Sequence, residues 1–464
     1  MASGVGVNAG ARLDRLPISS FHIRIMGLIG AGMFFDGYDM YVGTSALGAA
    51  VQSKFATLSQ VPQFISLGFL GMTIGAFVTG FLGDKFGRRF NYQFNLMIFG
   101  LASLVAAVAP DMTALNWIRF VMGIGLGAET VVGFSTLTEF VPPRVRGRWC
   151  AAMVLIVALG LPATAVLSNF IIPAFGWRPM FVIAGIGALI VWYLRKSLPE
   201  SPRWLESQGR MAEAEALMQE IEREAATAGP LPPPSPPAPA VSFSLASLVS
   251  PALLPRMVVG CVCLICINTV IFGFVQWLPT FFVQQGLSIT KSLNYTLVIV
   301  LGSPIGGIIG MFCADYLGRR PSIIGASIFT IILGAIYANV TDPTTILIVG
   351  FLLIVSIYVQ AVVLFGVYTP ELFPTEVRLR AVGICNTFGR LCNIVAPFIV
   401  LSLFTHYGIS GVLSLMIGLV VVQIAVVWVW GIEPVNRPLE AIEPAPRGAK
   451  GIHEVGTTQS SVAQ

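Results

Sequence analysis

Residues 84–89 read DKFGRR, and residues 315–320 read DYLGRR, at an offset of 231 (315 − 84). A second pair of motifs has nearly the same spacing. Residues 139–146 (EFVPPRVR) are echoed by residues 371–378 (ELFPTEVR), at an offset of 232 (371 − 139). In each half of the chain, the first motif follows the second long apolar segment and the second motif follows the fourth. Matched motifs at one spacing indicate an internal duplication. The sequence therefore predicts two parallel halves with the same order of helices.

The composition indicates what those helices are. Of the 464 residues, 55% are hydrophobic and 11% are charged, and the mean hydropathy is +0.83. A soluble protein of this size could not bury that much apolar surface, whereas a transmembrane bundle can. The sequence therefore predicts an all-α membrane protein with six spanning helices in each half. Apolar segments long enough to cross a bilayer recur twelve times, at residues 22–50, 61–83, 91–109, 113–140, 148–170, 177–195, 257–283, 293–316, 321–340, 344–370, 380–404 and 408–431.

The polar stretches divide the chain. Residues 1–195 form the predicted N-terminal half, and residues 256–432 form the C-terminal half. Residues 196–255 between them are expected to be a linker. This linker combines a charged, helix-prone part with a stretch, GPLPPPSPP at residues 229–237, that excludes a helix. Residues 433–464 are expected to be a polar tail.

The distribution of Lys and Arg predicts the orientation. Basic residues gather in the central linker, at both ends of the chain, and in the loops after the second and fourth helices of each half. The opposite loops contain only Lys54, Arg178 and Lys291. By the positive-inside rule, both termini and the linker are cytoplasmic. We expect a multi-pass protein of the inner (plasma) membrane, without a cleaved signal peptide, whose net charge of +5 reflects topology rather than nucleic-acid binding.

Charged residues inside the apolar segments are the main functional signal. They are Asp36, Asp39, Arg119, Glu129 and Arg390. An ionised side chain in hydrocarbon costs at least about 2.5 kcal/mol, so each is a candidate functional residue. Asp36 and Asp39, in the stretch FFDGYDMY (residues 34–41), are three residues apart and lie on one face of a helix. We predict proton coupling by Asp36, Asp39, Arg119 and Glu129.

These motifs resemble those of the major facilitator superfamily. Residues 80–89 (GFLGDKFGRR) match its loop signature between helices two and three, and residues 119–125 (RFVMGIG) match its fourth-helix motif. Residues 199–205 (PESPRWL) and 370–374 (PELFP) are similar to the sugar-porter branch and its organic-ion relatives. The resemblance covers nearly all of the apolar chain and implies the major facilitator fold. We expect a monomer in the lipid bilayer, with no cofactor, no metal and no enzymatic activity.

Two shorter resemblances point to a substrate class. Residues 36–39 (DGYD) resemble the first-helix acidic motif of aromatic acid:proton symporters. In the sugar-porter branch, an acid at the place of Asp39 pairs with a fourth-helix Arg, here Arg119. A permanent bridge that only ties these helices together is the alternative. Residues 386–397 are similar to the eleventh-helix pattern of aromatic-acid symporters and organic-anion carriers, in which Arg390 would bind a carboxylate in a bidentate manner. The alternative is that Arg390 pairs with Asp36 across the halves.

Two further groups of residues complete the predicted site. Around Arg390 we expect a substrate pocket formed by Tyr38, Tyr41, Phe272, Gln276, Trp277, Tyr358, Phe365 and Asn386. The alternative for each aromatic side chain is that it faces lipid or packs against other helices. Charge networks in the cytoplasmic loops would act as gates that hold the halves in one state, unless the basic residues serve only to orient the chain. The gate residues are Asp84, Arg88, Arg89, Glu139, Arg146, Asp315, Arg319, Glu371 and Arg378. The glycines of residues 123–127 are expected to allow close helix packing, not to bind a nucleotide.

The function predicted from these features is proton-coupled import of an organic anion, with an aromatic carboxylate as the expected class, by alternating access. A sugar or polyol:proton symporter is one alternative, but the seventh helix (GFVQWLP, residues 273–279) lacks the paired glutamines expected of sugar porters. An organic-cation or drug transporter could use the acids, but Arg390 argues against it. A membrane-bound enzyme has no support, because HExxH and GxSxG motifs are absent from the sequence.

Overall fold

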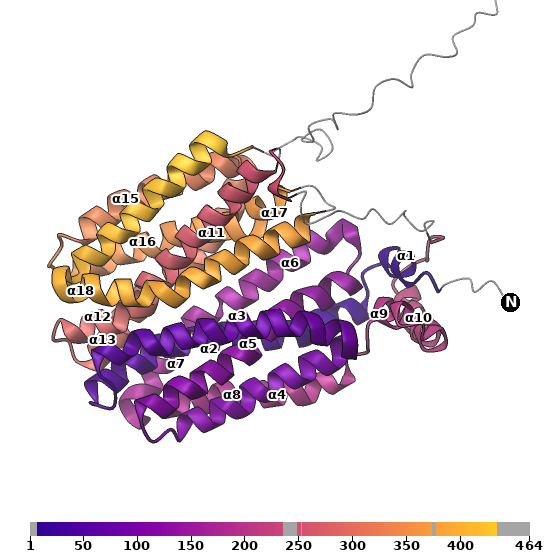
Figure 1. The fold of residues 1–464 in the computed structure, drawn as a ribbon, viewed down its shortest axis with the longest axis horizontal. Coiled ribbons are helices and arrows are strands. Elements are labelled where there is room, and N and C mark those ends of the chain that lie inside the picture. The colour runs from indigo at the N-terminus through magenta and orange to yellow at the C-terminus, as the bar shows by residue number, and fades with distance from the viewer. Residues whose placement is uncertain (1–6, 235–247, 252, 374–376, 434–464) are drawn as a thin grey trace, which may run out of the picture.

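The computed structural model describes residues 7–234, 248–251, 253–373 and 377–433. The expected tail beyond residue 433, and linker residues 235–247, which include the end of the Pro-rich stretch 229–237, lie outside these residues. Figure 1 shows the helices of the N-terminal half in one group and those of the C-terminal half in another. The helices α1, α9 and α10 lie together at one end, which we call the linker end. The opposite end, near α12 and α13, is called the far end.

The spanning helices follow the duplicated order expected from the motifs. The N-terminal half contains α2 (Ser20–Gln52), η1 (Leu58–Gln60), α3 (Val61–Phe86), α4 (Arg88–Ala107), α5 (Met112–Phe140), α6 (Pro143–Ala158), α7 (Gly160–Phe175) and α8 (Arg178–Leu194). The C-terminal half contains α11 (Leu254–Phe274), η4 (Val275–Trp277), α12 (Leu278–Gln284), α13 (Ile289–Val300), α14 (Gly302–Tyr316), α15 (Arg319–Tyr337), α16 (Pro343–Val362), η5 (Val363–Tyr368), α17 (Thr369–Glu371) and α18 (Arg378–Trp430).

The prediction of twelve spans is confirmed. Within the described residues, ten helical stretches are long and apolar enough to cross a membrane. The helix α2, with 33 residues, adds an eleventh, since its two carboxylates lower the mean hydropathy of an otherwise apolar helix. The 53 residues of α18 are two spans, because Gly408 has φ 63° and ψ −158° and interrupts the helix. The apolar segments thus fold into an all-α bundle with six spans in each half.

Four spans expected to be single helices are interrupted. The reason is proline, which lacks a backbone N–H and whose ring clashes with the carbonyl four residues earlier. In each case the interruption ends two or three residues before a proline. The four interruptions are Leu159 before Pro162, Val275–Trp277 before Pro279, Leu301 before Pro304, and the π-helix Val363–Tyr368 before Pro370. Residues 148–170, 257–283, 293–316 and 344–370 are therefore each divided into shorter helices.

The glycines of α5 pack against α3, as predicted. A Cβ atom added to Gly127 would lie 1.9 Å from the Met72 carbonyl oxygen. A Cβ added to Gly123 would lie 2.3 Å from the Gly68 carbonyl oxygen. Side chains cannot approach backbone atoms this closely, so these glycines let the two helices touch along their backbones. The close contact fixes the rotation of α5 and therefore the direction in which Arg119 points.

The linker end of the N-terminal half carries three short helices, α1 (Ala9–Asp14), α9 (Pro202–Ser207) and α10 (Met211–Ala226). One stripe of α10 is buried, at residues 214, 218, 221 and 225, with the spacing of an amphipathic helix. Arg12 of α1 bonds Glu222 and Glu215 of α10, at 2.7 and 2.5 Å. Arg203 of α9 bonds Asp14 of α1 at 2.6 Å. These ion pairs tie the start of the chain and the linker helices to the same half.

Candidate functional site

Asp39 and Arg119 form a buried ion pair between α2 and α5. Arg119 Nη1 donates to Asp39 Oδ2, and the two side chains are 0% and 5% exposed. The guanidinium also lies over the ring of Phe64, 5.2 Å from its centroid. The structure therefore contains the pair that the resemblance implied. Asp39 Oδ1 and Arg119 Nε are buried without a hydrogen-bond partner among the described residues, so the pair is incompletely satisfied.

Glu129 has a partner that sequence reasoning missed. Arg195, at the end of the apolar segment 177–195, is not among the charged residues that the sequence singles out. Its side chain and that of Glu129 are each 1% exposed, and its Nη1 donates to Glu129 Oε1. Its remaining donors reach α2, where Nε bonds the Leu28 carbonyl and Nη2 the Ile29 carbonyl, both at 2.8 Å. A Cβ on Gly32 would lie 2.1 Å from Arg195 Nη2. Arg195 thus joins α2, α5 and the end of α8 in one buried cluster.

Asp36 is the third buried acid. It is 3% exposed, and both carboxylate oxygens lack a hydrogen-bond partner among the described residues. Its charged neighbours are Glu129, Arg195, Asp39 and Arg390. A buried carboxylate without a partner is costly, so the site needs either a proton on Asp36 or a cation that approaches it.

The C-terminal half presents Arg390 from α18. The side chain is half-buried, and among the described residues it makes no hydrogen bond. Asn386 lies one turn earlier on the same helix and bonds the Val382 carbonyl at 3.0 Å. Asn393, which sequence reasoning did not single out, is fully buried with both amide atoms unpartnered within the described chain. Its signal in the sequence is its position three residues after Arg390, on the same face of the helix.

Three hydrogen bonds join the halves from the middle of the bundle toward the far end. The hydroxyls of Tyr41 and Tyr358 are 3.0 Å apart, and Ser66 Oγ donates to the Ile394 carbonyl at 2.6 Å. Gln276 Nε2 donates to the Met40 carbonyl at 3.2 Å. These bonds close this side of the interface.

Rings pack around the same contact. The ring of Tyr41 stacks on Phe272, with centroids 6.3 Å apart, and Phe272 meets Phe69 edge to face at 4.8 Å. Tyr41 belongs to one half, and Phe272 and Tyr358 belong to the other, so three of the predicted aromatic residues lie where the halves meet.

Three predicted pocket residues lie elsewhere. Tyr38 is buried inside the N-terminal half, where its hydroxyl bonds the Met180 carbonyl of α8 at 3.3 Å. Trp277 is fully buried and stacks on Phe281, which in turn stacks on Phe404. Phe365 is half-buried in the π-helix η5. Helix rotation places Tyr38 and Trp277 in the packing of their own halves in this conformation.

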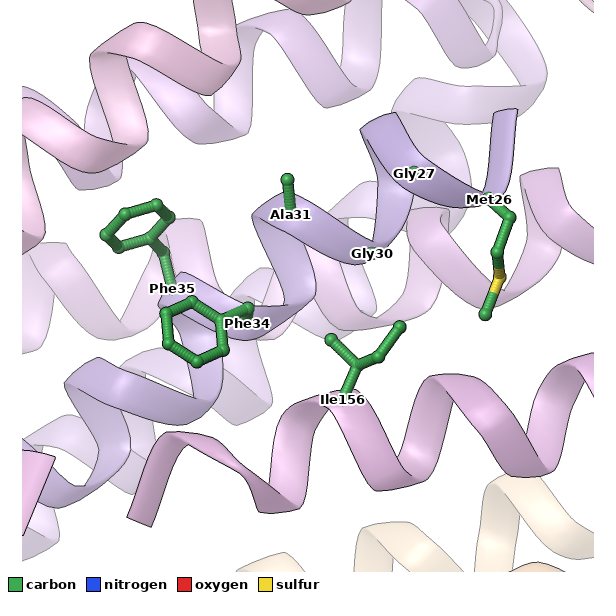
Figure 2. Close-up of a pocket in the computed structure, with 7 residues that line it drawn as sticks. All are labelled: Met26, Gly27, Gly30, Ala31, Phe34, Phe35 and Ile156. Atoms are coloured by element: carbon green, nitrogen blue, oxygen red, sulfur yellow. The ribbon is translucent and has the colours of Figure 1, made fainter. Parts of the chain in front are cut away.

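A cavity of about 320 Å³ lies along α2 and α6. Its lining is apolar and extends from Met26 to Phe35, with Ile156 of α6 opposite (Figure 2). None of the buried charged residues is among those that line this cavity, so it is distinct from the charged site.

The gate motifs form the same arrangement in both halves. Arg88 Nε bonds Glu139 at 2.9 Å, and Arg319 Nε bonds Glu371 at 2.9 Å. Gly87 and Gly318 precede these arginines with φ of 90° and 97°, a conformation that favours glycine. Both ion pairs stay within one half. Among the described residues, the expected networks therefore contribute one ion pair within each half, Arg88–Glu139 and Arg319–Glu371.

Two carboxylates complete these motifs and were not predicted. Glu200 accepts from the backbone N–H groups of Arg88 and Arg89 at the start of α4, at 2.9 and 3.2 Å. Glu433 accepts from the N–H groups of Arg319 and Arg320 at the start of α15, at 3.1 and 2.8 Å. Acids favour helix N-termini because the helix dipole is positive there. Burial nevertheless raises the pKa of the Glu200 carboxyl above its usual value.

The remaining gate residues make local contacts. The Arg89 side chain bonds the Lys196 carbonyl at 3.0 Å, and Arg378 Nε bonds the Phe373 carbonyl at 3.2 Å. Arg146 pairs with Asp14 of α1 at 3.3 Å, so this loop is tied to the start of the chain. The side chains of Asp84 and Asp315 lie outside the described part of the structure.

Buried ion pairs within a helical bundle, a duplicated loop motif and two halves joined by hydrogen bonds across their interface are features of a transporter. The model of the Major Facilitator Superfamily matches residues 29–397. This chain belongs to that superfamily. The inner membrane metabolite transport protein YdjE of Escherichia coli is 36% identical over 93% of this chain and 98% of its own length. The niacin transporter NiaP of Acinetobacter baylyi is 30% identical over 93% of this chain and 99% of its own length.

A solved structure supports the same fold for this member of the superfamily. The xylose transporter XylE of Escherichia coli, in a partially occluded inward open conformation, matches with a TM-score of 0.70 over 90% of this chain and all of that chain. At 20% identity this likeness concerns the fold alone. The chain is thus a multi-pass membrane protein that transports a small metabolite, and not an enzyme.

Proposed function

We propose that this superfamily member is a proton-coupled symporter that imports an organic anion, of the aromatic carboxylate class, by alternating access. The observation that carries the proposal is Arg390. Its guanidinium lies in a spanning helix, half-buried, and makes no hydrogen bond among the described residues. A cation in such a position is costly unless a counter-charge reaches it. A carboxylate matches the fork of a guanidinium with two parallel hydrogen bonds.

A relative and the ring cluster support the aromatic class. NiaP is named as a niacin transporter, and niacin is a carboxylic acid on an aromatic ring. The interface between the halves holds Tyr41, Phe272 and Tyr358, whose rings could stack on such a substrate. The carboxylate would face Arg390, and the ring would face these side chains.

Proton coupling is assigned to Asp39, with Asp36 as a second carrier. The Asp39 carboxylate bonds Arg119 when it is ionised and would release Arg119 when it binds a proton. The Asp36 carboxylate has no hydrogen-bond partner among the described residues, so no such bond opposes its protonation. The concentration of Lys and Arg at the linker end supports a cytoplasmic position for that end. Contacts at the far end then describe an inward-facing state, and rocking of the two halves would give alternating access.

The test of the anion proposal is a binding isotherm with niacin and with its methyl ester. Truncating a buried partner of a charged hydrogen bond typically costs about 2–5 kcal/mol, or roughly thirtyfold to several thousandfold in affinity. We expect Arg390→Ala to lose niacin binding by this amount, and Arg390→Lys to rescue it poorly because the fork geometry is lost. Thr387→Ala, on the same helix at an exposed residue whose hydroxyl bonds the Gly383 carbonyl, is the matched control and should bind niacin like the wild type.

The same isotherms separate the alternatives. The wild-type protein should bind the acid much more tightly than the ester. Equal affinities for acid and ester, or unchanged niacin affinity in Arg390→Ala, would contradict an anion carrier. Tight binding of a neutral sugar that survives Arg390→Ala would favour a sugar transporter, and tight binding of an organic cation would favour a cation transporter.

Arg88→Ala should slow transport without weakening substrate binding. The variant removes a half-buried hydrogen bond between charged groups, of about 1.5–3 kcal/mol, at the linker end and away from Arg390. We expect niacin turnover to fall about tenfold to a hundredfold and the niacin Kd to change less than about twofold. Arg89→Ala is the comparison, since that exposed side chain bonds a single carbonyl. Loss of binding with turnover retained would show that Arg88 does not act as a gate.

A further inference from the structure

A second, very small cavity lies where the two halves meet beside the Asp39–Arg119 pair. Its volume is about 10 Å³, close to the space that one water molecule needs. It is lined by Met40 of α2, four residues of α3, Arg119 of α5 and Gln276 of η4. Gln276 belongs to the C-terminal half, so this is a point where that half reaches the proton-carrying pair.

Two residues that line this cavity, Arg119 and Gln276, each have a buried polar atom without a hydrogen-bond partner among the described residues. Arg119 uses Nη1 for Asp39, and its Nε–H has no hydrogen-bond acceptor among the described residues. Gln276 uses Nε2 for the Met40 carbonyl, and its Oε1 accepts from no donor in the described part of the chain. Both residues are 4% exposed. One atom is a donor and the other an acceptor, and buried groups of this kind are normally paired with each other or through an ordered water.

The surrounding residues keep the contact open. Gly68 lies against the guanidinium, and a Cβ there would be 2.9 Å from Arg119 Nε. Gln276 lies in the short helix η4 that interrupts the spanning helix before Pro279. That interruption places the amide against the backbone of α2, one residue after Asp39. A continuous helix would direct this side chain elsewhere.

We propose that Gln276 transmits the protonation of Asp39 to the C-terminal half. Its Oε1 accepts from Arg119 Nε–H, directly or through one water, while its amide group holds the Met40 carbonyl. When a proton binds the Asp39 carboxylate, the ion pair weakens and the guanidinium turns toward Gln276. Protonation therefore strengthens the link between the halves and favours closure at the far end. Gln276 is thus a positioning residue for coupling, which replaces its expected role in the substrate pocket.

This inference rests on the proposed role of Asp39. The charged groups around that carboxylate are Arg119 of α5 and Asp36 on its own helix. Around Asp36 lie further charges, Glu129 of α5, Arg195 of η2 (Arg195–Ser197) and Arg390 of α18. Of these charged groups, Arg119 both bonds Asp39 and lines the cavity that is also lined by Gln276 of the C-terminal half. The effect of Asp39 protonation is therefore passed on through Arg119.

The test measures the separation of the halves at the far end as a function of pH, without any substrate. Spin labels are attached at Lys54 and Lys291, two exposed far-end residues in opposite halves, through a ketone-bearing unnatural amino acid that leaves the seven cysteines untouched. In the wild type, the ratio of closed to open populations should rise about fivefold as pH falls from 8 to 5, the effect of roughly one net hydrogen bond. Gln276→Leu should abolish this rise.

Control variants make the outcomes distinguishable. Ser66→Ala removes another bond between the halves, away from Arg119, and should shift the populations while retaining the response to pH. Gln276→Asn keeps the amide group on a side chain that is shorter by one methylene, and it should also lose the response to pH. This second variant tests the inference if Gln276→Leu does not fold. A full response in both Gln276 variants would overturn the inference. If Asp39→Asn also keeps a full response, the proposed proton role of Asp39 fails as well, and a wild type that ignores pH overturns both.

Discussion

Asp39→Asn should abolish proton-driven accumulation of substrate and leave exchange between equal pools. The amide is uncharged at every pH, so it resembles the protonated carboxyl and cannot take up or release a proton. Arg119, which bonds Asp39 Oδ2 in the structure, would then lack its ionic partner in every step of the cycle. The loss should be complete even though Asp36 can still carry a proton, because in the variant no protonation step makes or breaks the ion pair with Arg119.

The measurement uses proteoliposomes with an acidic exterior and radiolabelled niacin. Each pH unit supplies about 1.4 kcal/mol per proton, or roughly tenfold accumulation per proton carried. Wild-type vesicles should therefore concentrate niacin, and the variant should only equilibrate it. Asp111→Asn makes the same chemical change at the exposed N-cap of α5, where Asn also caps well, and should accumulate normally. Wild-type accumulation by Asp39→Asn would remove this residue from the mechanism.

Arg195→Met should destabilise the protein strongly. It leaves Glu129 buried without its cation and also removes two hydrogen bonds to the backbone of α2. Breaking one side of a buried ion pair typically costs about 3–5 kcal/mol, whereas replacing both partners by apolar residues is often neutral. We therefore expect a large fall in Tm for Arg195→Met, and a Tm much closer to wild type for Arg195→Met combined with Glu129→Leu.

Thermal unfolding of the purified protein in detergent measures both variants. Arg178→Met is a suitable comparison, because Arg178 is half-buried at the far end and bonds the carbonyls of Ala107 and Ala109, with no acidic partner among the residues that the structure describes. Its cost should be smaller. If the double variant were no more stable than Arg195→Met, then the unpaired charge on Glu129 would not be the cause of the loss.

Much of the fold could be read from the sequence because a bilayer leaves few choices. Spanning segments must be helical to satisfy their backbone hydrogen bonds, so twelve apolar stretches predict twelve helices. The repeated DKFGRR and DYLGRR motifs predict the duplication. Both motifs contain glycine, at residues 87 and 318, where the backbone has a positive φ that glycine adopts readily. Prolines at residues 162, 279, 304 and 370 carry the sequence signal for the interrupted spans.

Within the site, the sequence by itself determined which residues carry charge in the membrane, since an ionised group among apolar residues is visible without a structure. The tertiary structure decided their partners. Arg195 follows an apolar segment like an ordinary loop residue, yet its side chain turns back to Glu129. Tyr38 is one residue from Asp39 but points into α8, while Gln276 reaches α2 across the halves. Such contacts depend on the rotation and bending of helices distant in sequence, and these are set by packing of the whole bundle rather than by local residue type.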